Sequence, residues 1–245
     1  MYNVILAAGD GKRFSDYDLP KPLLKIRNKS LIVRAGKSLP KNNDYIFLCK
    51  KEHYDNHKEL KVDIKKNFKH SKVILVKKTT RGQASTLFKI KNIVKKKNPI
   101  LVTSTDLCFS FNKLTLKKYI KNDINIIFVC RPTIEMKKNY TQFGWVRSDK
   151  DDNVIKISCK KKIVGNNKKD KVILGAFGFS SFKTFLGGYN KMIKNKRLIN
   201  NEYYIDLLMD ELNKNKNKKV KIIEVKKFIN WGTPIEYEKN KNKTL

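Results

Sequence analysis

The sequence predicts an α/β fold with a mostly parallel central sheet, and three observations support this. Short apolar runs alternate with longer amphipathic runs along the first half of the chain, as strands and helices do in right-handed βαβ units. The short runs are apolar on both faces, which is typical of strands buried in a parallel sheet. The chain has 245 residues, of which 40% are hydrophobic, enough for a full core without disulfides.

The elements of the first half follow in order. Strands are expected at residues 2–8, 45–49, 72–76, 100–104 and 124–130. Helices are expected between them, at residues 30–39, 53–68, 83–96 and 113–121. Because ligands of parallel sheets bind at the carboxyl ends of the strands, residues that follow these strands are the first candidates for a site.

The second half predicts a smaller antiparallel region. Glycines and turn residues punctuate the expected strands, at residues 143–147, 154–158 and 171–180. Helices at about 181–194 and 201–213 and a strand at 220–225 follow. Neither an internal repeat nor a Pro/Gly/Ser-rich linker interrupts the sequence, so we expect a single domain over residues 1–238 and a frayed tail at 239–245.

The charge is large and positive. Lys and Arg number 56 against 22 Asp and Glu, a formal net charge of +34. The basic residues are mostly Lys, scattered along the chain and accompanied by Asn and Ile, which share A/T-rich codons. Nucleic-acid binders favour Arg on one stripe with interleaved aromatics, so this pattern argues against nucleic acid as a partner. Codon bias and a field that attracts anionic substrates or a polyanion remain two open explanations.

The cysteines and the hydropathy indicate a cytoplasmic protein. Cys49, Cys108, Cys130 and Cys159 are widely spaced in or beside apolar runs, and no C-x-x-C or Cys/His cluster could hold zinc. We therefore expect reduced core cysteines. No apolar stretch approaches the roughly 20 residues of a membrane span, and charges interrupt the first apolar run, so neither membrane insertion nor a signal peptide is expected.

A phosphate cradle is predicted after the first strand. The chain reads Leu6-Ala7-Ala8-Gly9-Asp10-Gly11-Lys12-Arg13, with Lys21-Pro22 eight residues beyond. Two glycines let backbone N–H groups approach an anion closely, and Lys12, Arg13 and Lys21 add cations. Neither a Walker A loop nor a dinucleotide fingerprint is present.

Two further strand ends carry polar residues. Thr80, Gly82, Gln83 and Ala84 open an expected helix, where backbone donors are left free. Asp106 follows the strand at 100–104, and such a carboxylate either caps the next element or binds Mg²⁺. The residues alone do not decide between these roles.

This set of motifs resembles the signature of the nucleotidyltransferases that activate phosphorylated sugars or alcohols, L-A-A-G-x-G-x-R followed by K-P. The resemblance implies a Rossmann-like, three-layer fold of the GT-A type, with a nucleotide-binding half at 1–131 and an acceptor-binding half at 132–238. It implies catalytic roles for Arg13, Lys21 and Asp106. It implies nucleotide contacts for Leu6, Ala7, Ala8, Gly9, Gly11, Lys12, Arg13, Lys21, Thr80, Gly82, Gln83, Ala84 and Ser104.

The resemblance also implies a metal and an acceptor site. Mg²⁺ is expected on Asp106; many relatives have a second Asp two residues before a later glycine, where this chain has Asn230, so Asn230 is a weaker ligand and Asp206 or Glu202 the alternative. A glycine-bearing segment at 143–146 resembles the acceptor segment of the family. The next element usually carries a Glu-Lys or Lys-Pro, and here residues 158–162 read Ser-Cys-Lys-Lys-Lys, which keeps the Lys but not the acidic residue. The implied acceptor-binding residues are Gly144, Lys160, Gly175, Glu202 and Tyr203.

The implied reaction couples a nucleoside triphosphate to a phosphorylated acceptor and releases pyrophosphate. The acceptor is a sugar 1-phosphate or a small phosphorylated alcohol, amine or amide, and the product supplies a surface polysaccharide or lipid. Three alternatives stay open: a cytidylyltransferase acting on a non-sugar phosphate, a basic nucleic-acid or polyanion binder of the same fold, and a glycosyltransferase. Against the last, Ser104 stands where the Asp-x-Asp motif of glycosyltransferases would need an acid. Assembly into a homo-oligomer also stays open.

Overall fold

The computed structural model describes residues 1–41, 44–165, 169–215, 217–243 and 245. The chain forms two compact units. Unit 1 comprises Met1–Thr80, Leu101–Ser110 and Lys226–Leu245, and unit 2 comprises Arg81–Ile100 and Phe111–Val225.

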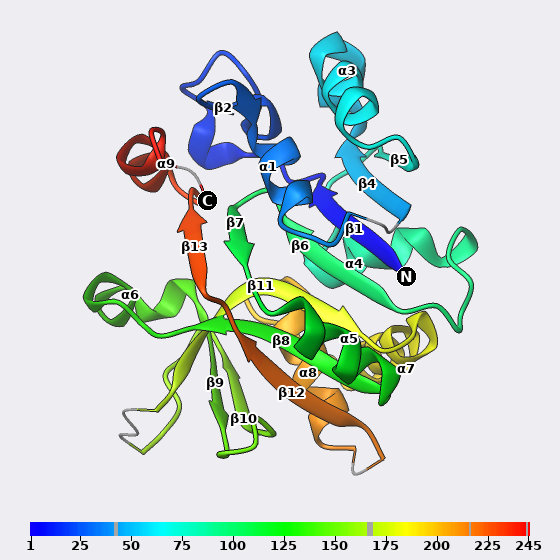
Figure 1. Ribbon diagram of the computed structural model, residues 1–245, viewed down its shortest axis with the longest axis vertical. Coiled ribbons are helices and arrows are strands. Elements are labelled where there is room, and N and C mark those ends of the chain that lie inside the picture. Colours follow the sequence, from blue (N-terminus) through cyan, green and yellow to red (C-terminus); the bar gives the residue numbers. More distant parts are fainter. Residues whose placement is uncertain (42–43, 166–168, 216, 244) are drawn as a thin grey trace. The chain divides into compact units, whose positions relative to one another are not determined.

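Unit 1 is built on a sheet of four neighbouring strands (Figure 1). Their order is β6 (Ile100–Ser104), β1 (Tyr2–Ala7), β4 (Asp44–Lys50) and β5 (Ser71–Val76). The pairs β1–β4 and β4–β5 are parallel, so the carboxyl ends of these three strands meet at one edge. The strands β1, β4 and β6 are almost wholly buried, as their continuous apolar runs require.

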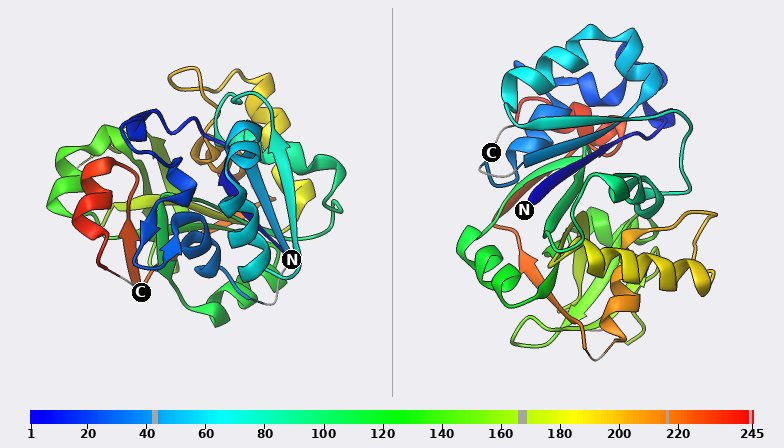
Figure 2. Two further views of the ribbon diagram at one scale, coloured as in Figure 1. Left: turned by 90° about the horizontal axis from the view of Figure 1, so that it is seen from above. Right: turned by 90° about the vertical axis from the view of Figure 1, so that its right-hand side faces the viewer.

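Helices and two short ribbons complete unit 1. Helix α1 (Leu31–Lys37) packs on β1, and α2 (Lys51–Asn56) packs on β4 and β5, while α3 (Lys58–Asn67) lies against α1 (Figure 2). One antiparallel ribbon joins β7 (Leu107–Ser110) to β13 (Lys227–Asn230), and the other joins β2 (Lys25–Ile26) to β3 (Lys29–Ser30). The 3₁₀ helices η1 (Lys12–Phe14) and η2 (Lys21–Leu23) follow β1, and α9 (Pro234–Asn240) follows β13.

A hydrophobic cluster ties the ends of unit 1 together. It joins residues near the amino end of the chain to β7, β13 and α9. Its buried members are Phe14, Leu24, Ile26, Leu31, Cys108, Ile229, Trp231 and Tyr237. Segments more than 200 residues apart in the sequence therefore share one core, which fixes the loops that follow β1 and β6 against the C-terminal segment.

Unit 2 is built on a largely antiparallel sheet. Its strand order is β10 (Val154–Cys159), β9 (Gly144–Ser148), β11 (Lys171–Phe179), β8 (Ile124–Cys130) and β12 (Lys219–Glu224), and only the β8–β12 pair among these is parallel. Helix α8 (Ile205–Asn213) packs on β10 and on α7 (Phe182–Lys194). The remaining helices are α4 (Gln83–Phe88), η3 (Lys89–Asn92), α5 (Lys113–Lys121), α6 (Ile134–Lys138) and η4 (Tyr140–Gln142).

The predicted fold class is confirmed, with corrections to several elements. The helix expected at 53–68 is two helices, because His57 takes an extended conformation between α2 and α3. The helix expected at 83–96 ends earlier, α4 passing into η3, and the helix expected from 201 begins at Ile205. Strands β7 and β13 were not predicted, since each is four residues long and stable only through its partner.

The compact units do not coincide with the predicted halves. The chain passes from unit 1 to unit 2 after Thr80, returns at Leu101 and returns again at Lys226. The assignment of residues 1–131 to the nucleotide and 132–238 to the acceptor concerns substrates and stays a prediction. Helix α9 covers the start of the tail predicted at 239–245, and Thr244 lies outside the described residues.

The cysteines are free and buried, as expected. Burial raises the pKa of the Cys49 and Cys130 thiols to about 12 and that of Cys108 to about 11, so these thiols stay protonated. Within the described part of the chain, no helix is long and apolar enough to cross a membrane.

Candidate active site

The glycine loop of unit 1 leaves β1 at the sheet edge. Leu6, Ala7 and Ala8 are buried, whereas Gly9 is exposed and a Cβ atom there would meet nothing within 4 Å. Gly11 adopts the left-handed conformation, with φ 65°, as the residue before η1. Its carbonyl accepts a 2.7 Å hydrogen bond from the Phe14 N–H. Glycine is favoured at position 11 because the turn into η1 needs this left-handed φ, which strains residues with a Cβ atom.

Asp10 ties this loop to the ends of two neighbouring strands. Its carboxylate accepts hydrogen bonds from the Thr79 hydroxyl, after β5, and from the Lys50 ammonium, at the end of β4, the latter over 3.1 Å. The Thr79 hydrogen bond, followed by that of Lys50, lowers the pKa of Asp10. The variable position of the glycine motif therefore anchors the loop, a role that sequence analysis missed.

Lys21 and Asp106 form an ion pair in unit 1. The Lys21 Nζ contacts Asp106 Oδ1, donates to the Gly232 carbonyl over 3.4 Å and lies 4.8 Å from the centre of the Phe14 ring. Only 9% of the Lys21 side chain is exposed, against 37% of that of Asp106. Burial acts to raise the pKa of Asp106, but the charge and hydrogen bond of Lys21, with the charge of Arg13, outweigh it and the pKa is lowered. The carboxylate is therefore ionised at neutral pH.

The backbone around Asp106 is held by Trp231, which is completely buried. The Trp231 indole N–H donates to the Thr105 carbonyl over 2.6 Å, and its backbone N–H donates to the Asp106 carbonyl over 2.8 Å. The Ser104 hydroxyl accepts a weaker bond, 3.3 Å, from the Asp106 N–H. Ser104, the last residue of β6, and Asp106 thus lie together at the end of that strand, and Trp231 is a supporting residue that no motif indicated.

Asn230 flanks the same loop but its amide is engaged. Its Nδ2 donates to Glu236 over 2.5 Å, and its Oδ1 accepts from the Gly232 N–H over 3.3 Å. Glu236 in turn receives the N–H and hydroxyl of Thr233 in the capping box of α9. The β7–β13 register sets Asn230 opposite Leu107, the residue after Asp106.

The donor set suits Mg²⁺ bound together with phosphates. Among the described residues no group of three or more His, Cys, Asp or Glu could hold a metal ion. Asp106 offers one partly exposed carboxylate, and Asn230 stands on the neighbouring strand opposite Leu107. Mg²⁺ commonly takes one or two carboxylates and completes its six oxygens from water and substrate phosphates. The residues therefore fit a metal that arrives with a triphosphate.

In unit 2, the segment of Gly82, Gln83 and Ala84, predicted to contact the nucleotide, is joined to Tyr203 through the backbone. The Tyr203 N–H donates to the Arg81 carbonyl over 2.9 Å, and the Ala84 N–H donates to the Tyr203 carbonyl over 3.0 Å. Gly82 has φ 92°, and a Cβ atom there would lie 2.8 Å from the Tyr203 nitrogen. Gln83 begins α4 next to it. Tyr203, predicted to bind the acceptor, therefore supports the segment predicted to contact the nucleotide.

A second cluster of unit 2 surrounds Asp206, in the first turn of α8. A Cβ atom at position 144 would lie only 2.0 Å from Asp206 Oδ2, so only glycine fits there. The β9–β10 register sets Gly144 opposite Cys159, whose thiol donates to the Asp206 carboxylate. Burial raises the pKa of Asp206 to about 6, and the Lys160 charge only partly offsets this.

Lys160 is held beside that cluster. It adopts φ 59°, its Nζ donates to the Gln142 carbonyl over 2.7 Å, and the same atom lies 5.4 Å from the centre of the Tyr204 ring. Gly144, Lys160 and Asp206 are thus brought together, although the sequence assigned Asp206 only as an alternative metal ligand. Gly175 lies on β11 with φ 74°, where the register with β8 shifts, and Glu202 bonds to Ile199.

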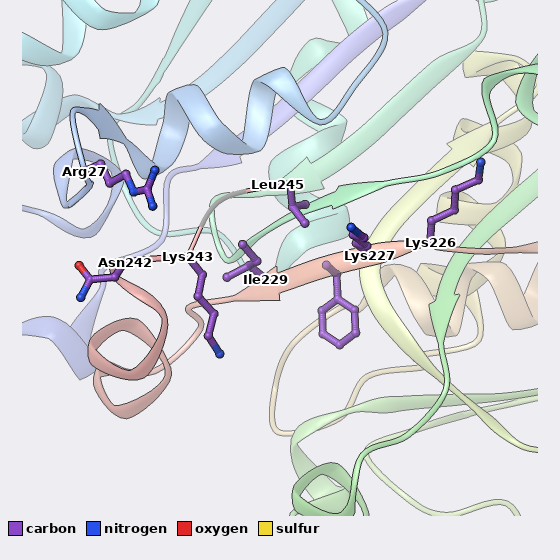
Figure 3. Close-up of a pocket in the computed structure, with 8 residues that line it drawn as sticks. Arg27, Lys226, Lys227, Ile229, Asn242, Lys243 and Leu245 are labelled. Carbon is purple, nitrogen blue, oxygen red and sulfur yellow. The ribbon is translucent and has the colours of Figure 1, made fainter.

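A separate pocket of about 600 Å³ opens on unit 1 (Figure 3). Its lining is basic and includes none of the predicted site residues. The lining residues are Arg27, Lys226, Lys227, Phe228, Ile229, Asn242, Lys243 and Leu245.

The fold is shared with solved nucleotidyltransferases. The nucleoside-diphosphate-sugar pyrophosphorylase of Vibrio cholerae RC9 matches with a TM-score of 0.78 at 19% identity, over 98% of each chain. A UDP-glucose pyrophosphorylase in complex with UDP-glucose matches with a TM-score of 0.74 at 17% identity, over 98% of this chain and 97% of its own. The inositol-1-phosphate CTP transferase of T. maritima matches with a TM-score of 0.68 at 16% identity, over 96% and 90%.

The sequence also assigns the chain to a protein family. A sequence model of the family described as Nucleotidyl transferase matches residues 2–173, and the chain belongs to that family. The predicted enzyme class is thereby confirmed. A search of curated proteins finds no match.

Proposed function

We propose that the protein is a Mg²⁺-dependent nucleotidyltransferase that joins a nucleoside triphosphate to a phosphorylated acceptor. The observation that carries this proposal is the position of Lys21. Its Cβ lies 3.9 Å from where a Cβ atom of Gly11 would stand, and its Nζ contacts Asp106. One side chain therefore touches both the glycine loop suited to phosphate and the carboxylate suited to the metal.

The reaction needs no side-chain nucleophile. A phosphate oxygen of the acceptor attacks the α-phosphorus of the triphosphate, the bond from that phosphorus to the bridging oxygen breaks, and pyrophosphate leaves with the electron pair. The barrier comes from bringing two anions together and from charge on the leaving group, so positioning and fixed positive charge supply the catalysis.

Each proposed residue has a role in that scheme. Gly9 and Gly11 present backbone N–H groups to the triphosphate, and Arg13 and Lys21 neutralise its charge. Asp106 holds Mg²⁺, which when bound offsets charge on the phosphates, with Asn230 or Asp206 as the candidate second ligand. The remaining nucleotide contacts are proposed for Leu6, Ala7, Ala8, Lys12, Thr80, Gly82, Gln83, Ala84 and Ser104.

The acceptor is proposed to bind in unit 2. Lys160 is a cation suited to its phosphate, and Gly144 lies across the β9–β10 pair from Cys159, the residue before Lys160. Gly175, Glu202 and Tyr203 are further candidates. The names of the relatives, a UDP-glucose pyrophosphorylase and an inositol-1-phosphate CTP transferase, support a sugar 1-phosphate or another phosphorylated alcohol as acceptor class. The proposal includes the case of a cytidylyltransferase that acts on a non-sugar phosphate. The protein is proposed to work in the cytoplasm, and its product to supply the synthesis of a surface polysaccharide or lipid.

Pyrophosphate release tests the proposal. The four ribonucleoside triphosphates and dTTP are assayed with Mg²⁺ against a panel of phosphorylated sugars, alcohols, amines and amides. We expect release with one nucleotide and one acceptor class, and Asp106→Asn is expected to lower the rate by on the order of 10²–10³. Asp44→Asn, at the opposite end of β4 from Lys50, is the matched control. No release with any pair would contradict the proposal.

The charge of +34 favours one second candidate, a polyanion binder on the same fold. It predicts binding of DNA or RNA that weakens steeply with salt and no turnover. The Lys21–Asp106 ion pair argues against a polyanion binder, because polyanion binding would not need a carboxylate beside the glycine loop.

A further inference from the structure

The carboxylate proposed to bind metal already has a cation on it. Asp106 Oδ1 is in contact with the Lys21 ammonium, and Lys21 is the more buried partner, with 9% of its side chain exposed against 37% for Asp106. The ammonium also bonds to the Gly232 carbonyl and faces the Phe14 ring. In the free protein, therefore, the charge of Asp106 is neutralised from inside unit 1.

A divalent cation and Lys21 compete for this carboxylate. No cluster of three metal-ligating side chains occurs among the described residues, so Asp106 does not belong to a preformed set of protein ligands. A metal ion bound beside an ammonium group would be repelled by it, and the repulsion between charges a few ångströms apart is strong at a partly buried site. Asp106 is thus a weak metal ligand while Lys21 remains on it.

Lys21 can reach a second anion without moving its backbone. The 3₁₀ helix that carries it is fixed by hydrogen bonds from Leu23 N–H to Pro20, 2.8 Å, and from Leu24 N–H to Lys21, 3.2 Å. Its stem lies against Gly11 of the glycine loop. A lysine has four rotatable methylenes and three donors, so rotation of the side chain is enough to change its partner.

We propose that Lys21 exchanges between Asp106 and the triphosphate, so that the protein binds metal well only when nucleotide is present. In the free protein Lys21 neutralises Asp106. When a triphosphate occupies the glycine loop, the ammonium transfers to it and Asp106 becomes available to the metal. This inference rests on the proposed function and adds to it a coupling between the two ligands through one side chain. Couplings of this kind typically amount to roughly 5- to 150-fold in affinity.

The first test measures Mn²⁺ binding without nucleotide, by electron paramagnetic resonance. Lys21→Met is expected to tighten Mn²⁺ binding about tenfold relative to the unmodified protein, within the range of such couplings. Lys29→Met is the matched control: it removes the same charge from an exposed position of unit 1 and should change Mn²⁺ affinity less than twofold. The double variant Lys21→Met/Asp106→Asn should lose the gain.

The second test measures the reciprocal effect, and its first part, Asp106→Asn alone, needs no Lys21 variant. Inorganic tripolyphosphate is titrated calorimetrically in EDTA, where no metal takes part. Asp106→Asn frees Lys21 and should tighten tripolyphosphate binding about tenfold. Removal of any nearby carboxylate attracts anions to some extent, so the same substitution is repeated in the Lys21→Met background, where we expect less than a threefold gain.

The outcomes distinguish the exchange of Lys21 from the proposed nucleotidyl transfer. An Mn²⁺ affinity unchanged by Lys21→Met, or an equal effect of Asp106→Asn in both backgrounds, overturns the exchange. Pyrophosphate release by the unmodified protein is measured alongside. Both binding effects without release would refute the proposed reaction and leave the exchange standing, whereas release without either effect would refute the exchange alone.

Discussion

The Trp231 indole N–H donates a 2.6 Å hydrogen bond to the carbonyl of Thr105, the residue immediately before Asp106. The backbone N–H of Trp231 holds the next carbonyl, that of Asp106 itself, at 2.8 Å. Because Trp231 is completely buried in the core of unit 1, both bonds are fixed from the inside. The direction of the Asp106 side chain is therefore set by a residue 125 positions later in the chain.

Trp231→Phe should disturb this loop. It keeps an aromatic ring in the core but leaves the Thr105 carbonyl without its indole partner, which costs about 1–3 kcal/mol for a buried group. We expect that loss in urea unfolding, together with weaker Mn²⁺ binding in the presence of tripolyphosphate.

Trp145→Phe is the matched control for this substitution. Trp145 makes the equivalent indole hydrogen bond, 3.0 Å to the Tyr140 carbonyl, in unit 2. Because this bond is only partly buried, the variant should show a smaller loss of stability, with unchanged Mn²⁺ binding. Equal effects of the two variants on Mn²⁺ would mean that Trp231 does not position Asp106.

Gly144→Ala tests the packing of Asp206. A Cβ atom at position 144 would lie 2.0 Å from Asp206 Oδ2 and 2.9 Å from its Cγ, so the first turn of α8 must shift from β9. We expect a loss of about 1–3 kcal/mol in the free energy of unfolding, as for other overpacked positions. Gly187→Ala, on α7 with nothing within 4 Å of the new Cβ, should instead leave stability unchanged or raise it by up to about 1 kcal/mol.

The double variant Gly144→Ala/Asp206→Ala sharpens this prediction. If the clash with the carboxylate is the cause, the two substitutions should be strongly non-additive, because the second removes the atom that the first meets. Additive losses would contradict the account.

Asp206 should give unit 2 a distinctive pH dependence. Its pKa is raised to about 6 in the folded chain, against an ordinary value of 3.8, so folding favours the protonated carboxyl. Stability from this group is therefore full below pH 4 and falls as the pH rises to 6, by about 3 kcal/mol in all.

The comparison with Asp206→Asn isolates that contribution. Other carboxylates, such as Asp10 and Asp106, have lowered pKa values, so their contribution to stability is lost mainly as the pH falls below 4, outside this range. Urea unfolding of both proteins from pH 4 to 7 should show the variant gaining on the unmodified chain as the pH rises. Parallel curves would show that Asp206 titrates normally.

Asn230→Asp should not simply add a metal ligand. Asn230 Nδ2 donates to Glu236 Oε1, so an aspartate would set two carboxylates against each other at the start of α9. We expect a loss of about 1–2 kcal/mol at pH 7, in the usual range for one substitution, that diminishes toward pH 4.

Asn230→Asp/Glu236→Gln is the compensated variant. The side-chain amide that it introduces at position 236 can still accept from Thr233 in the capping box and can donate to the new carboxylate at position 230. The variant should recover the lost stability and bind Mn²⁺ more tightly than the unmodified protein in the presence of tripolyphosphate. Recovery of stability with no change in Mn²⁺ binding would show that position 230 does not face the metal.

Much of the fold followed from local patterns. The alternation of apolar and amphipathic runs predicted β1, β4, β5, β6 and β8 within a residue or so of their bounds, and the turn-rich second half predicted β9, β10 and β11 as antiparallel. These patterns succeed because a strand buried on both faces must be apolar along its length. The short ribbon of β7 and β13 escaped prediction because neither strand is stable without the other.

The sequence by itself determined which residue types the chemistry could use: the two glycines of the loop, the cations Arg13 and Lys21, and a carboxylate after a buried strand. Such motifs are visible because they are local. The tertiary structure alone decided that Lys21 rests on Asp106, that Asp10 anchors the glycine loop, that Trp231 fixes the loop of Asp106 and that Asp206 requires Gly144. Each of these pairs joins residues tens of positions or more apart in the sequence, and only the folded core brings such residues into contact.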